Sequence, residues 1–179
     1  TLHCADFLLQ IGFEITFISP VLQIQTWCRS KGVICYESIQ EILELKKYDY
    51  LFSIVNSTII SGSFLKKIKK LAINYHDSLL PQFAGVNATP WALLSRSQKH
   101  GITWHVITER ADEGDIILQK HFSLTPEDTT VSVRTTCKNL AMSTFPVLVE
   151  QLMENSFTLV PQNLQNRTYY GLNKKPYGN

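Results

Sequence analysis

An amide and an imidazole stand two residues apart at the end of an apolar run in this chain. The run covers residues 71–73, and Asn74 and His76 follow it in a segment that continues Asp-Ser-Leu-Leu-Pro up to residue 81. Alternate residues of a β-strand face the same side, so both side chains are expected to point to one place. An amide N–H and an imidazole that converge on one point suit the stabilisation of a developing oxyanion.

A carboxylate that suits the same chemistry comes later in the chain. Asp112 and Gly114 lie in an expected turn before the apolar run 116–118. His105 precedes this turn on an expected strand and is a candidate to support Asp112 or a substrate. Asp77 neighbours the imidazole but points to the opposite face of an extended segment, so it is not assigned to catalysis.

The elements expected around these residues alternate between strands and helices. Apolar and β-branched runs predict strands at 13–18, 33–36, 50–55, 71–75, 101–107, 116–122 and, near the end, 157–160. Helical apolar spacing predicts helices at 2–10, 19–30, 38–45, 64–70, 89–97 and 129–153, the last kinked or divided by Pro146. This alternation is typical of an α/β protein. We expect an open, mostly parallel twisted sheet with helices on both faces, and a first strand missing because the chain starts on a helix.

The composition bounds the class of protein and its partners. The 179 residues are 44% hydrophobic and 18% charged, which suits one catalytic domain at 1–155 followed by a basic C-terminal extension or linker at 156–179. A net charge of +2 argues against nucleic acid as a partner. Four cysteines without a CxxC pair indicate reduced thiols in a cytoplasmic protein and no metal site. No apolar run has the length of a membrane span.

Several of these residues together resemble the formyltransferase family that uses 10-formyltetrahydrofolate. The resemblance rests on Asn74-x-His76, the Ser-Leu-Leu-Pro run 78–81, Gly85 and Asp112-x-Gly114. It covers residues 1–153 and implies a Rossmann-like formyltransferase fold and an enzyme that transfers a formyl group to an amine. The implied catalytic residues are Asn74, which donates a hydrogen bond to the formyl oxygen, and His76, which stabilises the oxyanion. Asp112 is implied to tune His76, order a water and relay the proton that leaves the amine.

The same resemblance implies two loops that hold the folate, mainly through backbone groups. The implied cofactor-binding residues are Ser57, Thr58, Ile59, Ile60, Thr108, Glu109, Arg110 and Ala111. The cosubstrate is then 10-formyltetrahydrofolate, with no metal.

The acceptor is the open part of this interpretation. Residues 86–93 and 101–106 look most like the formyltransferase domains of nonribosomal peptide synthetases, which implies a carrier-bound aminoacyl acceptor and adjacent domains of a larger enzyme. The loop 81–89 carries no Lys or Arg, so it offers no charged side chain to a phosphate. The alternatives are an amino-sugar N-formyltransferase, a formyltetrahydrofolate deformylase, and a non-catalytic folate-binding or scaffolding domain.

Overall fold

The computed structural model describes residues 1–42, 47–56 and 58–176. The chain divides into two compact units, Thr1–Tyr48 and Asp49–Asn179. The elements of the smaller unit are α1 (Leu2–Gln10), β1 (Thr16–Ile18), α2 (Leu22–Lys31), β2 (Ile34–Tyr36) and the 3₁₀ turn η1 (Ile39–Ile42). Strands β1 and β2 pair in parallel, with α2 as the crossover between them.

The helices of the smaller unit end where the sequence predicts. Helix α2 closes at Gly32, whose φ of 67° is a left-handed conformation that glycine adopts at low cost. The helix expected over 38–45 is a 3₁₀ turn within the described residues, and its residues 43–46 lie outside them. A strand before residue 1 stays a prediction.

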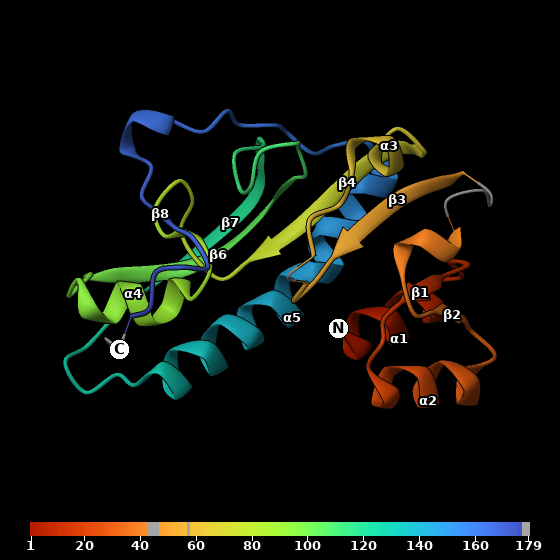
Figure 1. Cartoon of the computed structure of the whole chain (residues 1–179), viewed down its shortest axis with the longest axis horizontal. Helices are drawn as coiled ribbons and strands as arrows, with labels where there is room; N and C mark the ends of the chain where they lie inside the picture. The colour runs from red at the N-terminus through yellow and green to blue at the C-terminus, as the bar shows by residue number, and fades with distance from the viewer. Residues whose placement is uncertain (43–46, 57, 177–179) are drawn as a thin grey trace. The chain divides into compact units, whose positions relative to one another are not determined.

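The larger unit contains a four-stranded sheet in the order β3-β4-β6-β7. Its strands are β3 (Tyr48–Ser53), β4 (Ile68–His76), β6 (Lys99–Val106) and β7 (Ile116–Ser123). Figure 1 shows β3 and β4 running in the same direction. Strand β6 runs antiparallel to β4, and β7 runs antiparallel to β6.

The α/β class is confirmed, but the sheet of the larger unit is mixed rather than mostly parallel. A parallel pair needs a crossover connection, usually a helix. Only the residues 107–115 separate β6 from β7, and they form a loop without a helix. This connection returns the chain beside the strand it has just left, so the last two strands pair as a hairpin.

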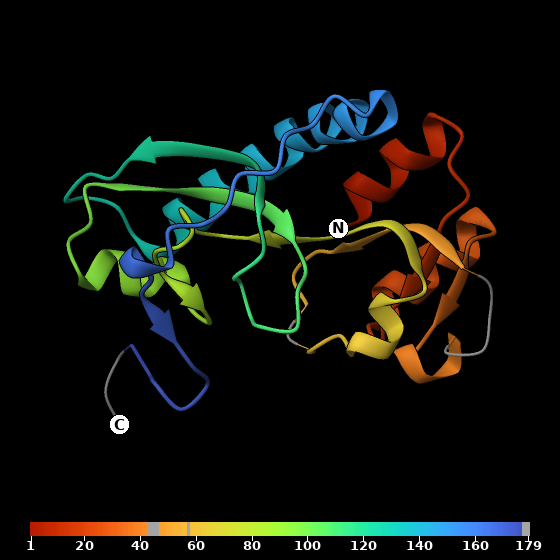
Figure 2. The same ribbon diagram turned by 90° about the horizontal axis from the view of Figure 1, so that it is seen from above.

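Helix α5 (Thr130–Glu154) lies along one face of this sheet (Figure 2). Thr129 begins it with a reciprocal capping box, as its hydroxyl accepts from the Ser132 N–H. Pro146 lies inside the helix, which nevertheless continues as a single element. The indole N–H of the fully buried Trp104 donates to the Thr144 hydroxyl at 3.0 Å, which fixes α5 against β6.

Two short helices flank the strand β4. Helix α3 (Gly62–Leu65) is capped by the Ser61 hydroxyl, and α4 (Ala88–Leu94) follows the loop after β4. The helix expected over 64–70 is wrong in its second half, because residues 68–70 already belong to β4. The strand therefore begins earlier than the apolar run 71–73 indicates.

The chain after α5 folds back onto the larger unit. Val160 forms an antiparallel bridge with Ile116, which is all that the structure shows of the strand expected at 157–160. A 3₁₀ turn η2 (Leu164–Asn166) follows, and β8 (Tyr169–Tyr170) then pairs in parallel with β5 (Ala84–Gly85). Gly85 has φ 93°, and a Cβ there would collide with the Tyr170 carbonyl.

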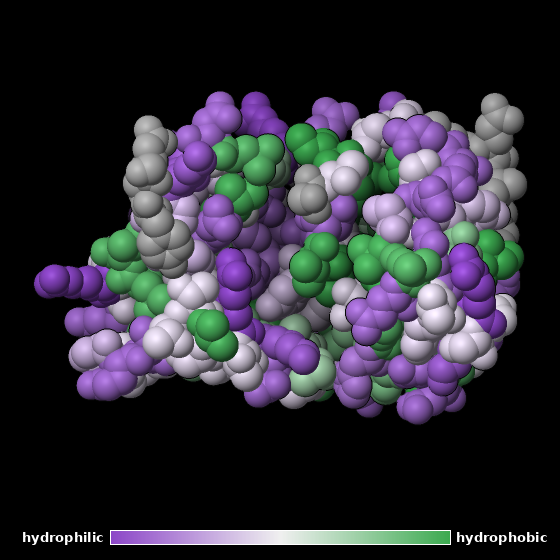
Figure 3. Space-filling model, turned by 60° about the horizontal axis from the view of Figure 1, so that its bottom comes forward, coloured by the Kyte–Doolittle hydropathy of each residue, from purple (hydrophilic) through white to green (hydrophobic). Residues whose placement is uncertain are grey.

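Among the described residues no helix is long and apolar enough to cross a bilayer. On the face drawn in Figure 3, apolar side chains lie in several patches separated by hydrophilic ones.

Candidate active site

Strand β4 presents Asn74 and His76 on one face, and the neighbouring strand β6 supplies a third polar side chain to it. In the antiparallel register, Asn74 lies opposite His105 and His76 lies opposite Thr103. Directly opposed residues of two strands share a face. The Asn74 amide nitrogen is 3.2 Å from Nε2 of His105. The convergence of Asn74 and His76 expected from their spacing therefore includes His105 as well.

Asp112 reaches these side chains from the loop that connects β6 to β7. Its Oδ1 lies 3.5 Å from His105 Nε2, and its Oδ2 lies 3.8 Å from His76 Nδ1. The same Oδ2 accepts a hydrogen bond of 2.8 Å from the Gly85 backbone N–H. One carboxylate thus faces two imidazoles and a peptide N–H, and its side chain is only 13% exposed.

The partners of Asp112 decide its charge. Burial alone raises the pKa of a carboxyl group, because it penalises the charged form. At Asp112 the hydrogen bond with His105, the charge of His76 and the Gly85 N–H outweigh burial and lower the pKa to about 2. Asp112 is therefore a carboxylate at neutral pH.

His76 is held in one ring orientation. Its Nε2 donates a hydrogen bond of 2.9 Å to the Phe83 carbonyl, so this nitrogen carries a proton. The other nitrogen, Nδ1, then faces Asp112, and the ring is buried. A His76 imidazolium would present one N–H to a carbonyl and the other toward the carboxylate.

His105 links the amide to the carboxylate. Its Nδ1 donates to the Val106 carbonyl at 2.9 Å, so Nε2 of the neutral ring is an acceptor for the Asn74 amide. A protonated ring would instead direct Nε2–H to Asp112. The support that the sequence suggested for His105 is thus present as direct contacts with both residues.

The two loops expected to hold folate lie side by side. A Cβ at Gly62, at the end of the first loop, would meet the Glu109 carboxylate oxygen of the second at 2.8 Å. Asn56 shapes the first loop, because its side chain accepts from the Thr58 N–H and donates to the Thr58 carbonyl. Ile59 is 86% exposed at its tip, while Ile60 is half-buried. Ser57 lies outside the described residues.

Several groups of the second loop already bind other groups of the protein. Thr108 donates to the Arg110 carbonyl, and the exposed Arg110 pairs with Glu113 at 3.6 Å. The carbonyl of Ala111 accepts a hydrogen bond from Arg167 at 3.0 Å. That carbonyl already has a protein partner, so it is the weakest of the expected folate contacts.

The residues that sequence reasoning missed lie in the C-terminal segment 156–179, expected to be an extension or linker. Gln162 Nε2 donates to the carbonyls of Asp112 and Gly114, at 3.0 and 2.6 Å. The Thr168 hydroxyl accepts from the Phe83 N–H at 2.7 Å. No spacing pattern in one sequence marks these residues, because their partners are backbone groups far away in the chain.

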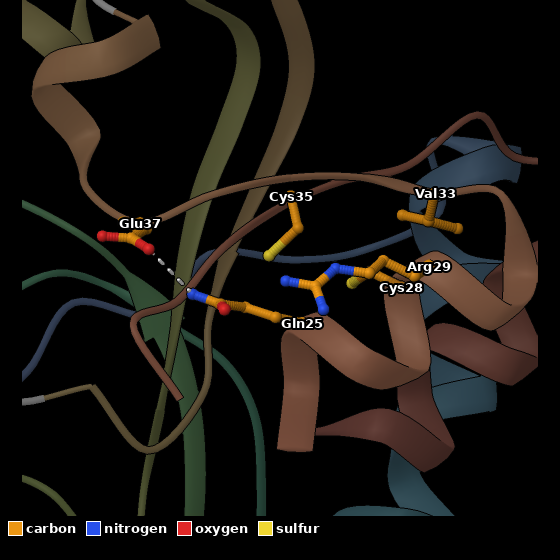
Figure 4. Close-up of a pocket in the computed structure, with 6 residues that line it drawn as sticks. All are labelled: Gln25, Cys28, Arg29, Val33, Cys35 and Glu37. Carbon is orange, nitrogen blue, oxygen red and sulfur yellow. Dashed lines mark hydrogen bonds between the residues drawn. The ribbon is translucent and has the colours of Figure 1, made fainter. Parts of the chain in front are cut away.

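A separate pocket in the smaller unit holds none of the predicted site residues. It measures about 170 Å³ and is lined by Gln25, Cys28, Arg29, Val33, Cys35 and Glu37 (Figure 4). Burial and the adjacent Cys35 raise the pKa of the Cys28 thiol to about 11, which makes it a weak nucleophile. Among the described residues no group of three or more His, Cys, Asp or Glu is arranged to hold a metal ion.

Comparison with known proteins places this chain in a family. Residues 26–149 match the family model described as "Formyl transferase". The GDP-perosamine N-formyltransferase of Brucella melitensis biotype 1 is 35% identical over 85 residues, which is 48% of this chain and 33% of that protein. The matched part thus spans a third of the length of this curated relative.

Solved structures share the fold at low sequence identity. The N-formyltransferase from Helicobacter canadensis, in complex with folinic acid and dTDP-3-aminofucose, matches with a TM-score of 0.81 at 21% identity, over 96% of this chain and 66% of that one. Phosphoribosylglycinamide formyltransferase from Bacillus halodurans matches with a TM-score of 0.74 at 20% identity, over 87% of this chain and 90% of that one. The family model covers more than half of the chain, so the chain belongs to the formyl transferase family.

Proposed function

We propose that this member of the formyl transferase family transfers the formyl group of 10-formyltetrahydrofolate to the amine of a nucleotide-linked amino sugar. The observation that carries the proposal is the convergence of Asn74, His76 and Asp112 on one buried point beside the end of β4. The reaction joins the acceptor nitrogen to the formyl carbon and then breaks the bond from that carbon to N10 of the folate. One proton leaves the amine and one is gained at N10.

The donors at this point fit the tetrahedral intermediate. The Asn74 amide has two N–H groups, of which His105 engages one, so the second is the donor for the formyl oxygen. Nε2 of His76 is already bound to the Phe83 carbonyl, so Nδ1, which lies 3.8 Å from the nearest Asp112 oxygen, is the nitrogen that can face the formyl oxygen. Donors held in place before the reaction stabilise the oxyanion without reorganising, which is the main source of their effect.

Asp112 acts chiefly through its charge. A group whose pKa is about 2 is a weak base near neutral pH, so it is poorly matched to carrying the proton from the amine. Its carboxylate instead faces Nδ1 of His76 at 3.8 Å and Nε2 of His105 at 3.5 Å, so its negative charge acts on both rings without accepting a proton. The proton relay implied by the family resemblance then needs a water beside Asp112.

The amino-sugar acceptor was the alternative to the aminoacyl acceptor in the sequence interpretation. It is supported by the names of the Brucella and Helicobacter relatives, which are N-formyltransferases named with GDP-perosamine or solved with dTDP-3-aminofucose. No relative named above has a carrier-bound acceptor in its name. We therefore prefer the sugar acceptor to the carrier-bound one.

The folate is proposed to lie along the two adjacent loops, near Thr58, Ile59, Ile60, Thr108, Glu109, Arg110 and Ala111. The proximity of Gly62 and Glu109 supports a single slot built from both loops. The exposed Ile59 offers apolar surface that a pteridine ring would cover.

The test is a competition assay with purified protein and 10-formyltetrahydrofolate. The acceptors are a nucleotide-linked amino sugar, glycinamide ribonucleotide, a carrier-bound aminoacyl thioester, and water alone. Mass spectrometry identifies the formylated product, and absorbance follows the release of tetrahydrofolate. Formylation of the amino sugar above the other acceptors is the expected result.

A matched pair of variants ties the activity to the site. Asp112→Asn should abolish most of the transfer, whereas Asp115→Asn makes the same change three residues away on the same loop and should retain it. Tetrahydrofolate release with water alone would indicate a deformylase, and no release with any acceptor would indicate a non-catalytic folate-binding domain. Either result would contradict the proposed function.

A further inference from the structure

The loop that carries Asp112 holds an unfavourable backbone conformation. Asp112 has φ 56°, in the left-handed region that non-glycine residues rarely occupy. Phe83, whose carbonyl orients His76, has φ 55° on the loop after β4. Conformations of this kind persist where surrounding contacts determine them. Both loops on which the catalytic geometry depends therefore need support from elsewhere in the chain.

One C-terminal segment supplies that support to the Asp112 loop. The bridge between Val160 and Ile116 brings the chain alongside the start of β7, so that Gln162 lies beside Gly114. The Gln162 amide then donates to two carbonyls of the loop, those of Asp112 and Gly114. Because both donors of one planar amide are engaged, the position of this turn is closely defined.

Arg167 holds the same loop through two further groups. Its guanidinium donates to the Ala111 carbonyl at 3.0 Å and lies 3.6 Å from the Glu113 carboxylate. Both charged side chains are less than a quarter exposed, at 20% and 18%. The carbonyls of residues 111, 112 and 114 are thus all bound by side chains of the C-terminal segment.

The same segment fixes the loop after β4. Thr168 makes three hydrogen bonds to it, with the N–H of Phe83, the N–H of Ala84 and the carbonyl of Pro81. The Tyr170 carbonyl accepts from the N–H of Val86. The Phe83 carbonyl that binds His76 and the Gly85 N–H that binds Asp112 both lie within this stretch.

We infer that Gln162 and Arg167 are positioning residues of the catalytic site, which set the Asp112 carboxylate against His76 and His105. Neither residue touches the reacting atoms; each acts through the backbone of the loop 111–114. This role deepens the proposed function and rests on it where activity is measured. The effect on the positions of the two imidazoles is expected in the free protein as well, whatever the acceptor is.

The test uses the full chain and compares two glutamines of the same segment. Gln162→Glu keeps the size of the side chain but sets a carboxylate against two carbonyl oxygens, and Gln162→Ala removes both hydrogen bonds. Gln165→Glu and Gln165→Ala make the same changes at an exposed position three residues on. A misplacement of about 1 Å costs about 10²-fold in rate. We expect kcat to fall roughly 10- to 100-fold in both Gln162 variants, with the KM for folate within about threefold of wild type.

A second readout follows the imidazoles without any turnover. In NMR titrations of the protein alone, the His76 and His105 signals should change in the Gln162 variants and stay unchanged in the Gln165 variants. Arg167→Lys keeps the charge beside Glu113 but loses the planar fork, and should give a smaller change of the same kind.

The results separate this inference from the proposed function. If wild type formylates no acceptor, the proposed function fails, while the imidazole signals still report on positioning. Gln162 variants with unchanged imidazole signals, or with kcat within about threefold of wild type, would overturn the inference. So would a general loss of folding in the Gln162 and Arg167 variants, because the segment would then support the whole unit rather than the site.

Discussion

Replacing Asp112 by asparagine tests whether its charge, rather than its shape, holds the site together. The asparagine oxygen can still accept from the Gly85 N–H, which among the described residues makes the one hydrogen bond of the Asp112 carboxylate shorter than 3 Å. The substitution therefore removes the negative charge with little loss of hydrogen bonding or volume. Any change in stability that follows should come from the interaction of that charge with its surroundings.

The pKa of Asp112 gives the size of the effect. It falls from 3.8 to about 2 on folding, and each pKa unit is worth about 1.36 kcal/mol, so the carboxylate contributes roughly 2 kcal/mol at neutral pH. A depressed pKa in the folded state gives stability that is fully present above the unfolded value of 3.8. That stability is lost as pH falls from the unfolded value through about 2.

Urea unfolding at pH 7 and pH 3 measures this contribution. Asp112→Asn should be less stable than wild type by about 2 kcal/mol at pH 7 and by only about 1 kcal/mol at pH 3. The other acidic groups cancel in the comparison, because both proteins carry them. A difference between the two proteins that is the same at both pH values would refute the reasoning, since it would show that the carboxylate makes no net electrostatic contribution.

Four further experiments extend this test to the rest of the site. Asn74→Ala should lower kcat by about 10²–10³ with little change in urea midpoint, because it removes one oxyanion donor. Combining Asp112→Asn with His76→Ala should cost far less than the product of the two single losses in kcat, as expected of groups that act as a unit. Gly85→Ala should destabilise the protein by about 2–4 kcal/mol in thermal or urea unfolding, since its Cβ would strike the Tyr170 carbonyl. Thr103→Val should cost about 2–4 kcal/mol in the same assays, because the fully buried hydroxyl bonds two backbone groups of the loop after β4.

The part of the site that could be predicted from the sequence depends on local geometry. Asn74 and His76 share a face because strands alternate, and this holds whatever surrounds the strand. Asp112 was predicted from its family resemblance, and its loop does bring it to both imidazoles. The role of His105 needed the register of β4 and β6, which sets it opposite Asn74. Register depends on pairing between distant segments, which one sequence does not display.

The errors in the fold have the same origin. Residues 68–70 are one Ile and two lysines, which suit an exposed helix as well as the exposed end of a strand. Pairing in the sheet makes them a strand. The expectation of a mostly parallel sheet came from the alternation of strands and helices in the first half of the chain. Between β6 and β7 the chain has a loop and no helix, which breaks that alternation. Because this loop is too short for a crossover, β7 runs antiparallel to β6.

The charges around the loop 81–89 show why the acceptor could not be inferred from the residues of that loop alone. The loop 81–89 carries no Lys or Arg, which disfavoured a phosphate-bearing acceptor when only that loop was considered. The fold places β8 directly beside β5 of this loop, and the cations that follow β8 come with it. Lys174 lies over the ring of Tyr170, 5.8 Å from its centre. Lys174, more than eighty residues after the loop, is thus brought beside it. The lack of Lys and Arg in the loop itself therefore does not argue against an acceptor that carries a nucleoside diphosphate.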